Sequence, residues 1–314
     1  MPVLCLKVDV DTLRGTLEGV PRLLALFQRE GVSATFLFSM GPDHTGRALK
    51  RVFRPGFLAK VRRTSVRSNY GLKTLLYGTL LPGPDIGRLG QSVMRAVRDA
   101  GFECGIHCWD HVAWQDGVMQ RGDTWARGQM QRAHERFLAV FGEGARTMGA
   151  AGWQMSRDAL RAQGTLGYRY ASDARSDHAD AGPFWPLIRA EAMPVVQVPT
   201  TLPTLDEMIG LDGCTPENVA DRLLSQTANA RRDHVFTLHA ELEGMAMLPV
   251  MERLITGWRE QGYELIGTGQ YVDGLDLDAL PFCELEWGTL GGRSGTLLKQ
   301  GSPYLVSLEH TLRR

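Results

Sequence analysis

The sequence predicts an α/β protein, a distorted (β/α) barrel, and two observations carry this prediction. Short apolar runs typical of strands alternate with amphipathic helical patterns along most of the 314 residues. Repeated β-α units give parallel strands with right-handed crossovers, and about seven or eight such units are too many for a small open sheet. Polar residues also stand where several apolar runs end, and in a barrel the carboxyl ends of the strands form the active-site face.

The first strand shows the pattern most clearly. Leu4, Leu6, Val8 and Val10 alternate with residues of the other face, and this period of two predicts a strand over residues 3–10. The other predicted strands cover residues 34–39, 102–107, 147–151, 168–172, 194–198, 234–239 and 263–267. The predicted helices cover residues 17–31, where Gly31 ends the helix, and residues 87–100, 124–142, 156–162, 216–230 and 248–261.

Composition indicates an ordinary globular enzyme or binding protein. Apolar residues make up 43% and charged residues 22% of the chain, and the formal net charge is zero, so nothing draws it to nucleic acid. Its five cysteines are an odd number that fits free thiols in a reducing compartment. We see no signal peptide and no run of about 20 apolar residues that could span a membrane. We therefore expect a cytoplasmic protein.

Five residues from three places predict one metal-centred hydrolytic site. Asp9 and Asp11 lie on one side of the end of the first strand, where two carboxylates repel unless a cation lies between them or one is protonated. His107 and His111 have the four-residue spacing that places two imidazoles on one helical face, which suits two ligands of one divalent ion. His239 ends another apolar strand. Together these side chains can support metal-assisted hydrolysis.

Each of these features also has a plainer explanation. An Asp-x-Asp pair at a strand end is often a turn or a helix cap, and a single His after a buried strand is usually a core or surface imidazole. Cys104 and Cys108 lie among the histidines, but four ligands within eight residues cannot surround one ion, so we interpret both thiols as packing. A purely structural metal is a weaker alternative, because structural zinc usually takes four protein ligands and three are offered here.

The segment from residue 44 to residue 84 departs from the alternating pattern. It contains nine basic residues and no acidic residue, with apolar and aromatic residues between them. We expect it to be an insertion after the second strand that lies over the site. Its composition is typical of an element that lies on anionic lipid, with Arg54, Arg62 and Arg63 as candidate phosphate contacts. The alternative is a solvated helical lid.

These motifs resemble the NodB-type polysaccharide deacetylases, carbohydrate esterase family 4, over about residues 3–270. The resemblance implies a distorted (β/α) barrel with a divalent metal held by one Asp and two His. The run VDVDT implies that Asp9 is the base and Asp11 a ligand, and the His-x-x-x-His motif implies that His107 and His111 complete the ligand set. The pair Leu238–His239 matches the last motif, whose His acts as an acid.

Two further positions follow from the same resemblance. Asp173, in the run YASDAR, is expected to orient His239. The third family motif normally offers an Arg that pairs with the base, but the corresponding stretch here is MGAAGW. Arg146 or Arg175 could supply that cation. We expect the barrel domain to cover residues 1–275, followed by a Gly-rich extension, residues 276–314, which predicts a strand pair of unknown role.

A narrower resemblance points to one branch of the family. The runs RGTLEGVPRLL, FSMGPDHTGR, GIHCWDHVAWQD, GAAGW, YASDAR and TLHAELEG are similar to the 4-deoxy-4-formamido-L-arabinose-phosphoundecaprenol deformylases of lipid A modification. This implies hydrolysis of an N-formyl group from an undecaprenyl-phosphate-linked sugar at the cytoplasmic side of the inner membrane, in a pathway of polymyxin resistance. It also implies one divalent ion, which could be Zn, Mn, Co or Fe.

Several side chains are candidates for contact with the sugar. Trp109, Trp114 and Trp153 could form stacking walls, although burial in the core is an alternative for at least one of them. A backbone N–H near Trp109 or Asp110 could stabilise the oxyanion. Two other functions stay open at this point: a deacetylase of another N-acyl amino sugar, and a non-catalytic lipid- or carbohydrate-binding protein on the same fold.

Overall fold

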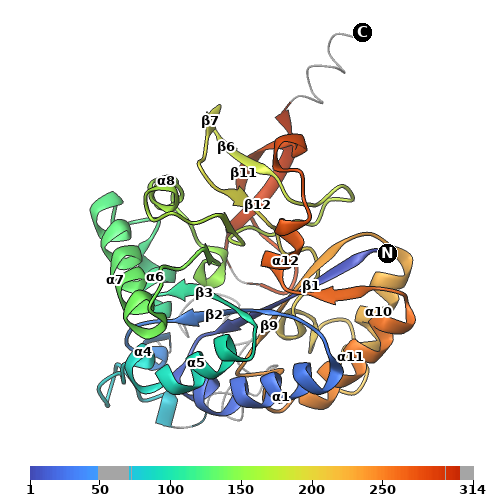
Figure 1. Ribbon diagram of the computed structural model, residues 1–314, viewed down its shortest axis with the longest axis horizontal. Helices are drawn as coiled ribbons and strands as arrows, with labels where there is room; N and C mark the ends of the chain where they lie inside the picture. The colour runs from blue at the N-terminus through green and yellow to red at the C-terminus, as the bar shows by residue number, and fades with distance from the viewer. Residues whose placement is uncertain (49–70, 72, 294, 305–314) are drawn as a thin grey trace.

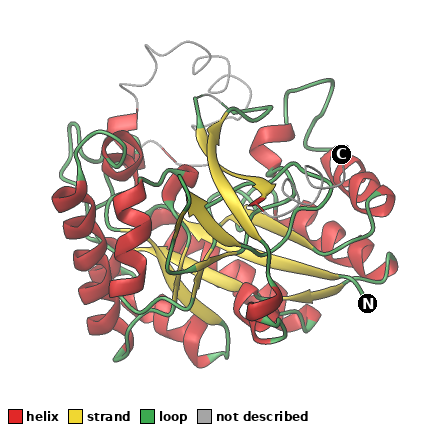
Figure 2. Ribbon diagram, turned by 90° about the horizontal axis from the view of Figure 1, so that it is seen from above, coloured by secondary structure: helices red, strands yellow, loops and turns green. Residues whose placement is uncertain are grey.

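A computed structural model describes residues 1–48, 71, 73–293 and 295–304. At its centre is one curled sheet of parallel strands (Figures 1 and 2), which confirms the predicted barrel-type α/β fold. The strand order is β10-β1-β2-β3-β4-β5-β8, with β9 also paired to β1. The strands are β1 (Val3–Val10), β2 (Thr35–Ser39), β3 (Glu103–Cys108), β4 (Thr147–Met148), β5 (Tyr170–Ala171), β8 (Val196–Gln197), β9 (His234–His239) and β10 (Glu264–Ile266).

Helices lie on both sides of this sheet and below it in Figure 1. The apolar side chains between sheet and helices form the buried core. The longer ones, α1, α5, α7, α10 and α11, match the helical patterns of the sequence. The predicted helix over residues 87–100 is divided at Gly90 into two helices. The helices are η1 (Gly15–Gly19), α1 (Val20–Glu30), α4 (Ile86–Leu89), α5 (Gln91–Asp99), α6 (His111–Gly117), α7 (Asp123–Phe141), η3 (Ala151–Trp153), α8 (Arg157–Thr165), α9 (Leu205–Met208), α10 (Val219–Asn229), α11 (Leu248–Glu260), α12 (Thr268–Asp273) and η4 (Leu277–Ala279).

Strand β1 positions much of the site because it is the most highly paired strand of the sheet. It pairs in parallel with β2, β9 and β10. The register places Asp9 opposite Leu37 on one side and His239 on the other. Since paired residues of neighbouring strands project to the same face of a sheet, this register brings Asp9 and His239 to one face at the carboxyl ends of their strands.

A second, smaller sheet joins the C-terminal extension to the rest of the fold. Its order is β12-β11-β6-β7, with β6 (Trp185–Ile188), β7 (Glu191–Ala192), β11 (Phe282–Gly288) and β12 (Leu297–Pro303). The predicted strand pair is confirmed as the antiparallel pair β11–β12. Strands β6 and β7 were not predicted. The extension therefore packs onto residues of the barrel region, above the main sheet in Figure 1.

Within the described residues, no helix has the length and apolar composition needed to cross a membrane. Most of the predicted insertion, residues 49–70 and 72, lies outside the described residues. Arg54, Arg62 and Arg63 belong to that part.

Candidate active site and metal centre

Asp11, His107 and His111 converge as the sequence predicted. One ligand atom from each lies within 4.8 Å of the other two. Asp11 Oδ1 lies 3.2 Å from His107 Nε2, and Asp11 Oδ2 lies 3.4 Å from His111 Nε2. Asp11 and His107 are buried, whereas the His111 side chain is 21% exposed, so the cluster opens to solvent on the His111 side. One carboxylate and two imidazoles are a donor set for a divalent metal ion.

The prediction that both histidines share a helical face is wrong. His107 lies near the end of β3, and His111 is the first residue of α6. The turn between them is fixed by Asp110, whose side chain accepts a hydrogen bond from the N–H of Ala113 and caps the helix. The ligand pair therefore spans a strand-to-helix turn, which still brings the two rings to 5.3 Å between centroids.

A backbone carbonyl selects the tautomer of His107. Its Nδ1 lies 2.7 Å from the carbonyl oxygen of Gly149, and a carbonyl oxygen can only accept, so Nδ1 carries the hydrogen. In the neutral ring, Nε2 is then a lone-pair donor that faces Asp11 Oδ1, a buried oxygen without a hydrogen-bond partner among the described residues. Two acceptors at this distance repel unless a cation lies between them, so these residues fit a metal ion.

Asp11, His107 and His111 are called the ligand cluster below. Asp9 lies beside this cluster and is itself buried. Its Oδ1 is 3.8 Å from His107 Nδ1 and has no hydrogen-bond partner among the described residues. Its Oδ2 is 3.5 Å from the ammonium group of Lys7. Lys7 was not singled out from the sequence, although its position two residues before Asp9 on the same strand face was a signal that could have found it.

Glu241 fixes the loop that carries Asp11, and it too was missed. Its Oε1 accepts hydrogen bonds from the N–H groups of Asp11 and Thr12 and from the Thr12 hydroxyl. A Cβ at Gly15 would lie 1.9 Å from this oxygen, so a larger residue there would displace the Glu241 carboxylate. Burial and the neighbouring Asp11 raise the pKa of Glu241 to about 8.

The charges of the cluster support one another. Burial opposes ionisation of Asp11, but His111, His107 and His239 in their protonated forms outweigh it and hold the pKa of Asp11 below its usual range. Burial lowers the pKa of His239, yet the carboxylates around it, with Asp11 the strongest, reverse this and raise its pKa. The neighbouring carboxylates therefore favour the protonated form of His239, the form that can donate a proton.

Comparisons with known proteins identify the family of this chain. No family model matches the chain. A protein of Shewanella sediminis (strain HAW-EB3), named a probable 4-deoxy-4-formamido-L-arabinose-phosphoundecaprenol deformylase ArnD, is 35% identical over 297 residues, which cover 95% of this chain and 94% of the relative. The chain belongs to this deformylase family. A protein of Wigglesworthia glossinidia brevipalpis with the same name is 25% identical over 287 residues, covering 91% of this chain and 98% of the relative.

Solved structures show that the deformylase family shares the polysaccharide deacetylase fold. A protein of Mycobacterium smegmatis described as a polysaccharide deacetylase has a TM-score of 0.59 at 16% identity, covering 91% of this chain and 95% of its own. The chitin deacetylase of Colletotrichum lindemuthianum has a TM-score of 0.52 at 14% identity, covering 86% and 87%. At these identities the likeness establishes the fold alone.

In this deformylase family member, Asp173 does not orient His239. Its Oδ1 accepts from the N–H of Ala150, and its Oδ2 accepts from the side chains of Gln163 and Gln197. Burial raises the pKa of Asp173, and these three hydrogen bonds oppose the shift. The predicted contact with His239 is wrong because Asp173, which follows β5, binds Gln163 of α8 and Gln197 of β8 instead.

The carboxylates that influence His239 come from later in the chain. Asp206 on α9 and Glu243 are among the acids that raise the pKa of His239. Glu243 Oε2 accepts a hydrogen bond from the N–H of His239 at 2.7 Å. Burial raises the pKa of Glu243 to about 7. Neither residue was singled out from the sequence.

Neither arginine suggested as the partner of the base fills that role. Arg146 is exposed and precedes β4. Arg175 is buried, but its guanidinium forms two hydrogen bonds with the carboxylate of Glu207, at 2.7 and 3.0 Å, and lies 4.6 Å from the centre of the Trp153 ring. The cation beside Asp9 is Lys7.

Two of the three tryptophans proposed as sugar walls are core residues. Trp114 is 2% exposed, and its Nε1 donates to the carbonyl oxygen of Gln154. Trp153 is also 2% exposed, with Arg175 and Arg293 lying over its ring. A ring so covered offers no face to a sugar, so these two expectations are wrong.

Trp109 and Asp110 lie in the turn between β3 and α6, and Trp109 also lines the small pocket beside His107. Trp109 is partly buried, and the guanidinium of Arg136 lies 5.5 Å from its ring centre. Asp110 is engaged by the cap of α6 and by His44, whose Nδ1 lies 2.6 Å from Asp110 Oδ2. Contact of either residue with substrate stays a prediction.

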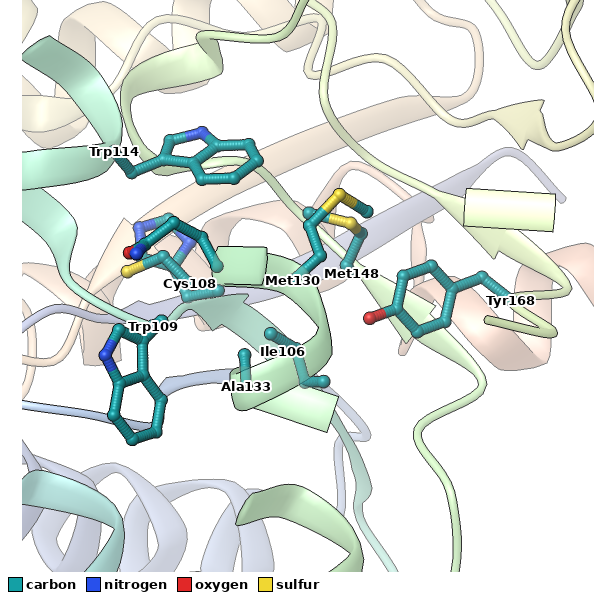
Figure 3. Close-up of a pocket in the computed structure, with 10 residues that line it drawn as sticks. Ile106, Cys108, Trp109, Trp114, Met130, Ala133, Met148 and Tyr168 are labelled. Atoms are coloured by element: carbon teal, nitrogen blue, oxygen red, sulfur yellow. The ribbon is translucent and has the colours of Figure 1, made fainter. Parts of the chain in front are cut away.

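A small pocket borders the ligand His107 between β3 and α7 (Figure 3). Its wall is mostly apolar and includes Ile106, Met130, Met148 and Tyr168. Asp9, Asp11 and His239 do not line it. We therefore assign the chemistry to the open side of the ligand cluster and not to this pocket.

Proposed function

We propose that the protein is a metal-dependent hydrolase that removes the N-formyl group from undecaprenyl-phosphate-linked 4-deoxy-4-formamido-L-arabinose. The products are formate and the 4-amino sugar lipid used in lipid A modification and polymyxin resistance. The observation that carries the proposal is the geometry of one sheet face. There, Asp11, His107 and His111 surround one point, and Asp9 and His239 flank it from neighbouring strands. The names of the relatives support the formyl sugar lipid as substrate.

Asp11, His107 and His111 would hold the metal ion. When bound, a divalent ion such as Zn, Mn, Co or Fe polarises the formyl carbonyl and lowers the pKa of a water molecule. The three protein ligands leave room for reactants, as in catalytic sites and unlike structural zinc sites. The carbonyl of Gly149 fixes the ring of the ligand His107, and Glu241 fixes the loop of Asp11, so the ligands are held in place before the ion binds.

Asp9 and His239 would move the protons. Asp9 Oδ1 has no hydrogen-bond partner within the described part of the chain, which suits a general base that takes a proton from the attacking water. His239 faces Asp9 across the register of β1 and β9, and the acids around it favour its protonated form. It can therefore give a proton to the leaving amine, which is a poor leaving group without one. In this scheme Asp9 and His239 are the catalytic residues.

A role at the membrane surface follows from the insertion. Its first described residues lie beside the ligand cluster, because His44 contacts Asp110 and Asp110 caps the helix that begins with His111. The insertion carries the basic residues predicted to meet a lipid phosphate, among them Arg54, Arg62 and Arg63. We infer that the protein works on the cytoplasmic leaflet of the inner membrane as a peripheral protein.

The decisive experiment is mass spectrometry of synthetic undecaprenyl-phosphate formamido-arabinose incubated with the purified protein. We expect a mass loss that corresponds to formyl release, abolished by a chelator and restored by added divalent metal. The acetamido version of the same lipid is the matched substrate control, because the acetyl group needs more room at the carbonyl carbon. Cleavage of the acetyl lipid alone would indicate a deacetylase, and turnover of neither lipid would contradict the enzyme assignment.

A further inference from the structure

Lys7 is a fully buried lysine in the middle of the main sheet. It lies on β1 two residues before Asp9, so both side chains leave the strand on the same face. Removing an ammonium group from water is unfavourable unless an opposite charge compensates. A lysine at this position therefore requires a specific partner.

The surroundings of Lys7 hold its ammonium group beside one oxygen of Asp9. Nζ lies 3.5 Å from Asp9 Oδ2 and donates a hydrogen bond to the carbonyl oxygen of Ser172 at 3.2 Å. It also lies 5.2 Å from the centre of the Trp153 ring. A Cβ at Gly149 would come within 3.3 Å of Nζ, so the glycine leaves room for the ammonium group.

The two oxygens of Asp9 therefore have different environments. Oδ2 faces Lys7, while Oδ1 faces the ligand cluster, 3.8 Å from His107 Nδ1. Among the residues that the structure describes, Lys7 is the Lys or Arg that pairs with Asp9. The guanidinium of the buried Arg175 is instead paired with the carboxylate of Glu207.

We propose that Lys7 is the positioning residue of the base: it holds Asp9 Oδ2 and fixes the rotation of the carboxylate so that Oδ1 is directed at the reacting water. It takes the part that the resemblance assigns to an arginine of the third motif, which this chain lacks. The inference rests on the proposed role of Asp9 as base. A carboxylate oriented by a fixed charge acts through geometry that even small displacements disturb.

A double-mutant cycle tests this inference in the full-length, metal-loaded protein. The variants are Lys7→Met, which keeps the unbranched apolar stem but lacks the ammonium group, Asp9→Asn, and the two combined. We expect Lys7→Met to lower kcat for the formyl lipid by roughly 10- to 100-fold with KM within about twofold. Combined with Asp9→Asn, it should lower kcat no further than Asp9→Asn alone, because a residue that acts only through Asp9 has nothing left to position.

Two measurements separate positioning from folding. Bound metal and the melting temperature are determined for every variant, and Lys299→Met, which removes a partly exposed lysine paired with Asp177, is the matched control with wild-type kcat expected. If Lys7→Met does not fold, Lys7→Gln replaces it in the cycle, since it removes the charge but keeps a polar end group in the buried position.

The outcomes distinguish this inference from the proposed function. If Asp9→Asn is as active as the wild type, Asp9 is not the base and the proposed mechanism fails. If Asp9→Asn is impaired but the Lys7 substitution lowers kcat equally in both backgrounds, Lys7 acts independently of Asp9. If the Lys7 substitution leaves kcat unchanged in an otherwise wild-type chain, Lys7 does not position the base. Either of these last two results overturns the inference about Lys7 alone.

Discussion

Asp9 and His239 occupy paired positions on the neighbouring parallel strands β1 and β9, both at the end of the strand that opens onto the ligand cluster. This register places the proposed base and the proposed acid on neighbouring strands without the help of a flexible loop. Strands hold side chains more precisely than loops do, so the relative position of these two residues is set when the sheet forms.

Asp9→Asn and His239→Ala should each lower kcat by about 10²- to 10⁴-fold, the range expected for loss of a general base or acid. Neither residue belongs to the ligand set, so the metal content should be unchanged. Turnover of the formyl lipid and metal analysis check both statements. Asp212→Asn, at an exposed position, is the control. Wild-type turnover no higher than that of the two site variants would favour a non-catalytic binding protein.

His111→Ala should weaken metal binding more than the roughly 10- to 100-fold that loss of an outer partner costs, because it removes a ligand itself. Competition against a coloured chelator measures the affinity. His178→Ala, which removes an exposed imidazole, should bind metal like the wild type. Equal affinity in the His111 variant would show that the cluster of Asp11, His107 and His111 is not the metal site.

Glu207→Ala should destabilise the fold by about 3–5 kcal/mol, because it leaves the buried guanidinium of Arg175 without its counter-charge. Urea unfolding followed by tryptophan fluorescence measures the change. Asp221→Ala is the matched control, since it breaks an exposed ion pair with Arg253 that should contribute little. Similar midpoints for the two variants would contradict a structural role for the Arg175–Glu207 pair.

Glu243 should make the protein less stable as the pH rises. Burial raises its pKa to about 7 in the folded state, above the ordinary value of 4.5 that it regains on unfolding. Between these values the folded state binds more protons than the unfolded state, so stability falls as the pH rises through this window. Glu243→Gln should reduce that slope and raise the melting temperature above pH 7. An unchanged slope would show that Glu243 ionises normally.

Vesicles that contain phosphatidylglycerol should carry the protein upward in a flotation gradient at low salt, and added salt should release it. Replacing Arg54, Arg62 and Arg63 together with Ser should reduce the floating fraction. Vesicles of phosphatidylcholine alone are the control. If the wild-type protein stays at the bottom with anionic vesicles, the proposed membrane association is wrong.

Much of the sheet and the ligand set could be predicted because both depend on short-range patterns. Alternating apolar residues identify β1, and polar residues at strand ends identify Asp9, Asp11 and His239. The prediction that His107 and His111 share one helical face was wrong because their spacing alone does not locate the start of the helix. Asp110, a good N-cap residue just before HVAW, was the signal that places the boundary there.

The residues that support the site were harder to predict because their partners are distant in sequence. Lys7 donates a hydrogen bond to Ser172, and Glu241 accepts one from Asp11. Both contacts depend on the pairing of strands that are distant in sequence. Asp173 was correctly placed after a strand, but which groups it meets depends on Gln163 and Gln197. No local pattern encodes these contacts. The resemblance to a family suggested a role for Asp173 that the side chains around it do not support.

The small sheet has a practical consequence for anyone who shortens this chain. Removing residues after 275 would delete β11 and β12, leaving the edge of β6 with unpaired backbone groups. It would also remove Arg293, and with it the contact with the Trp153 indole and the ion pair with Glu207. We expect such a truncated chain to aggregate, so the C-terminal hairpin is an integral part of the enzyme and not a removable tail.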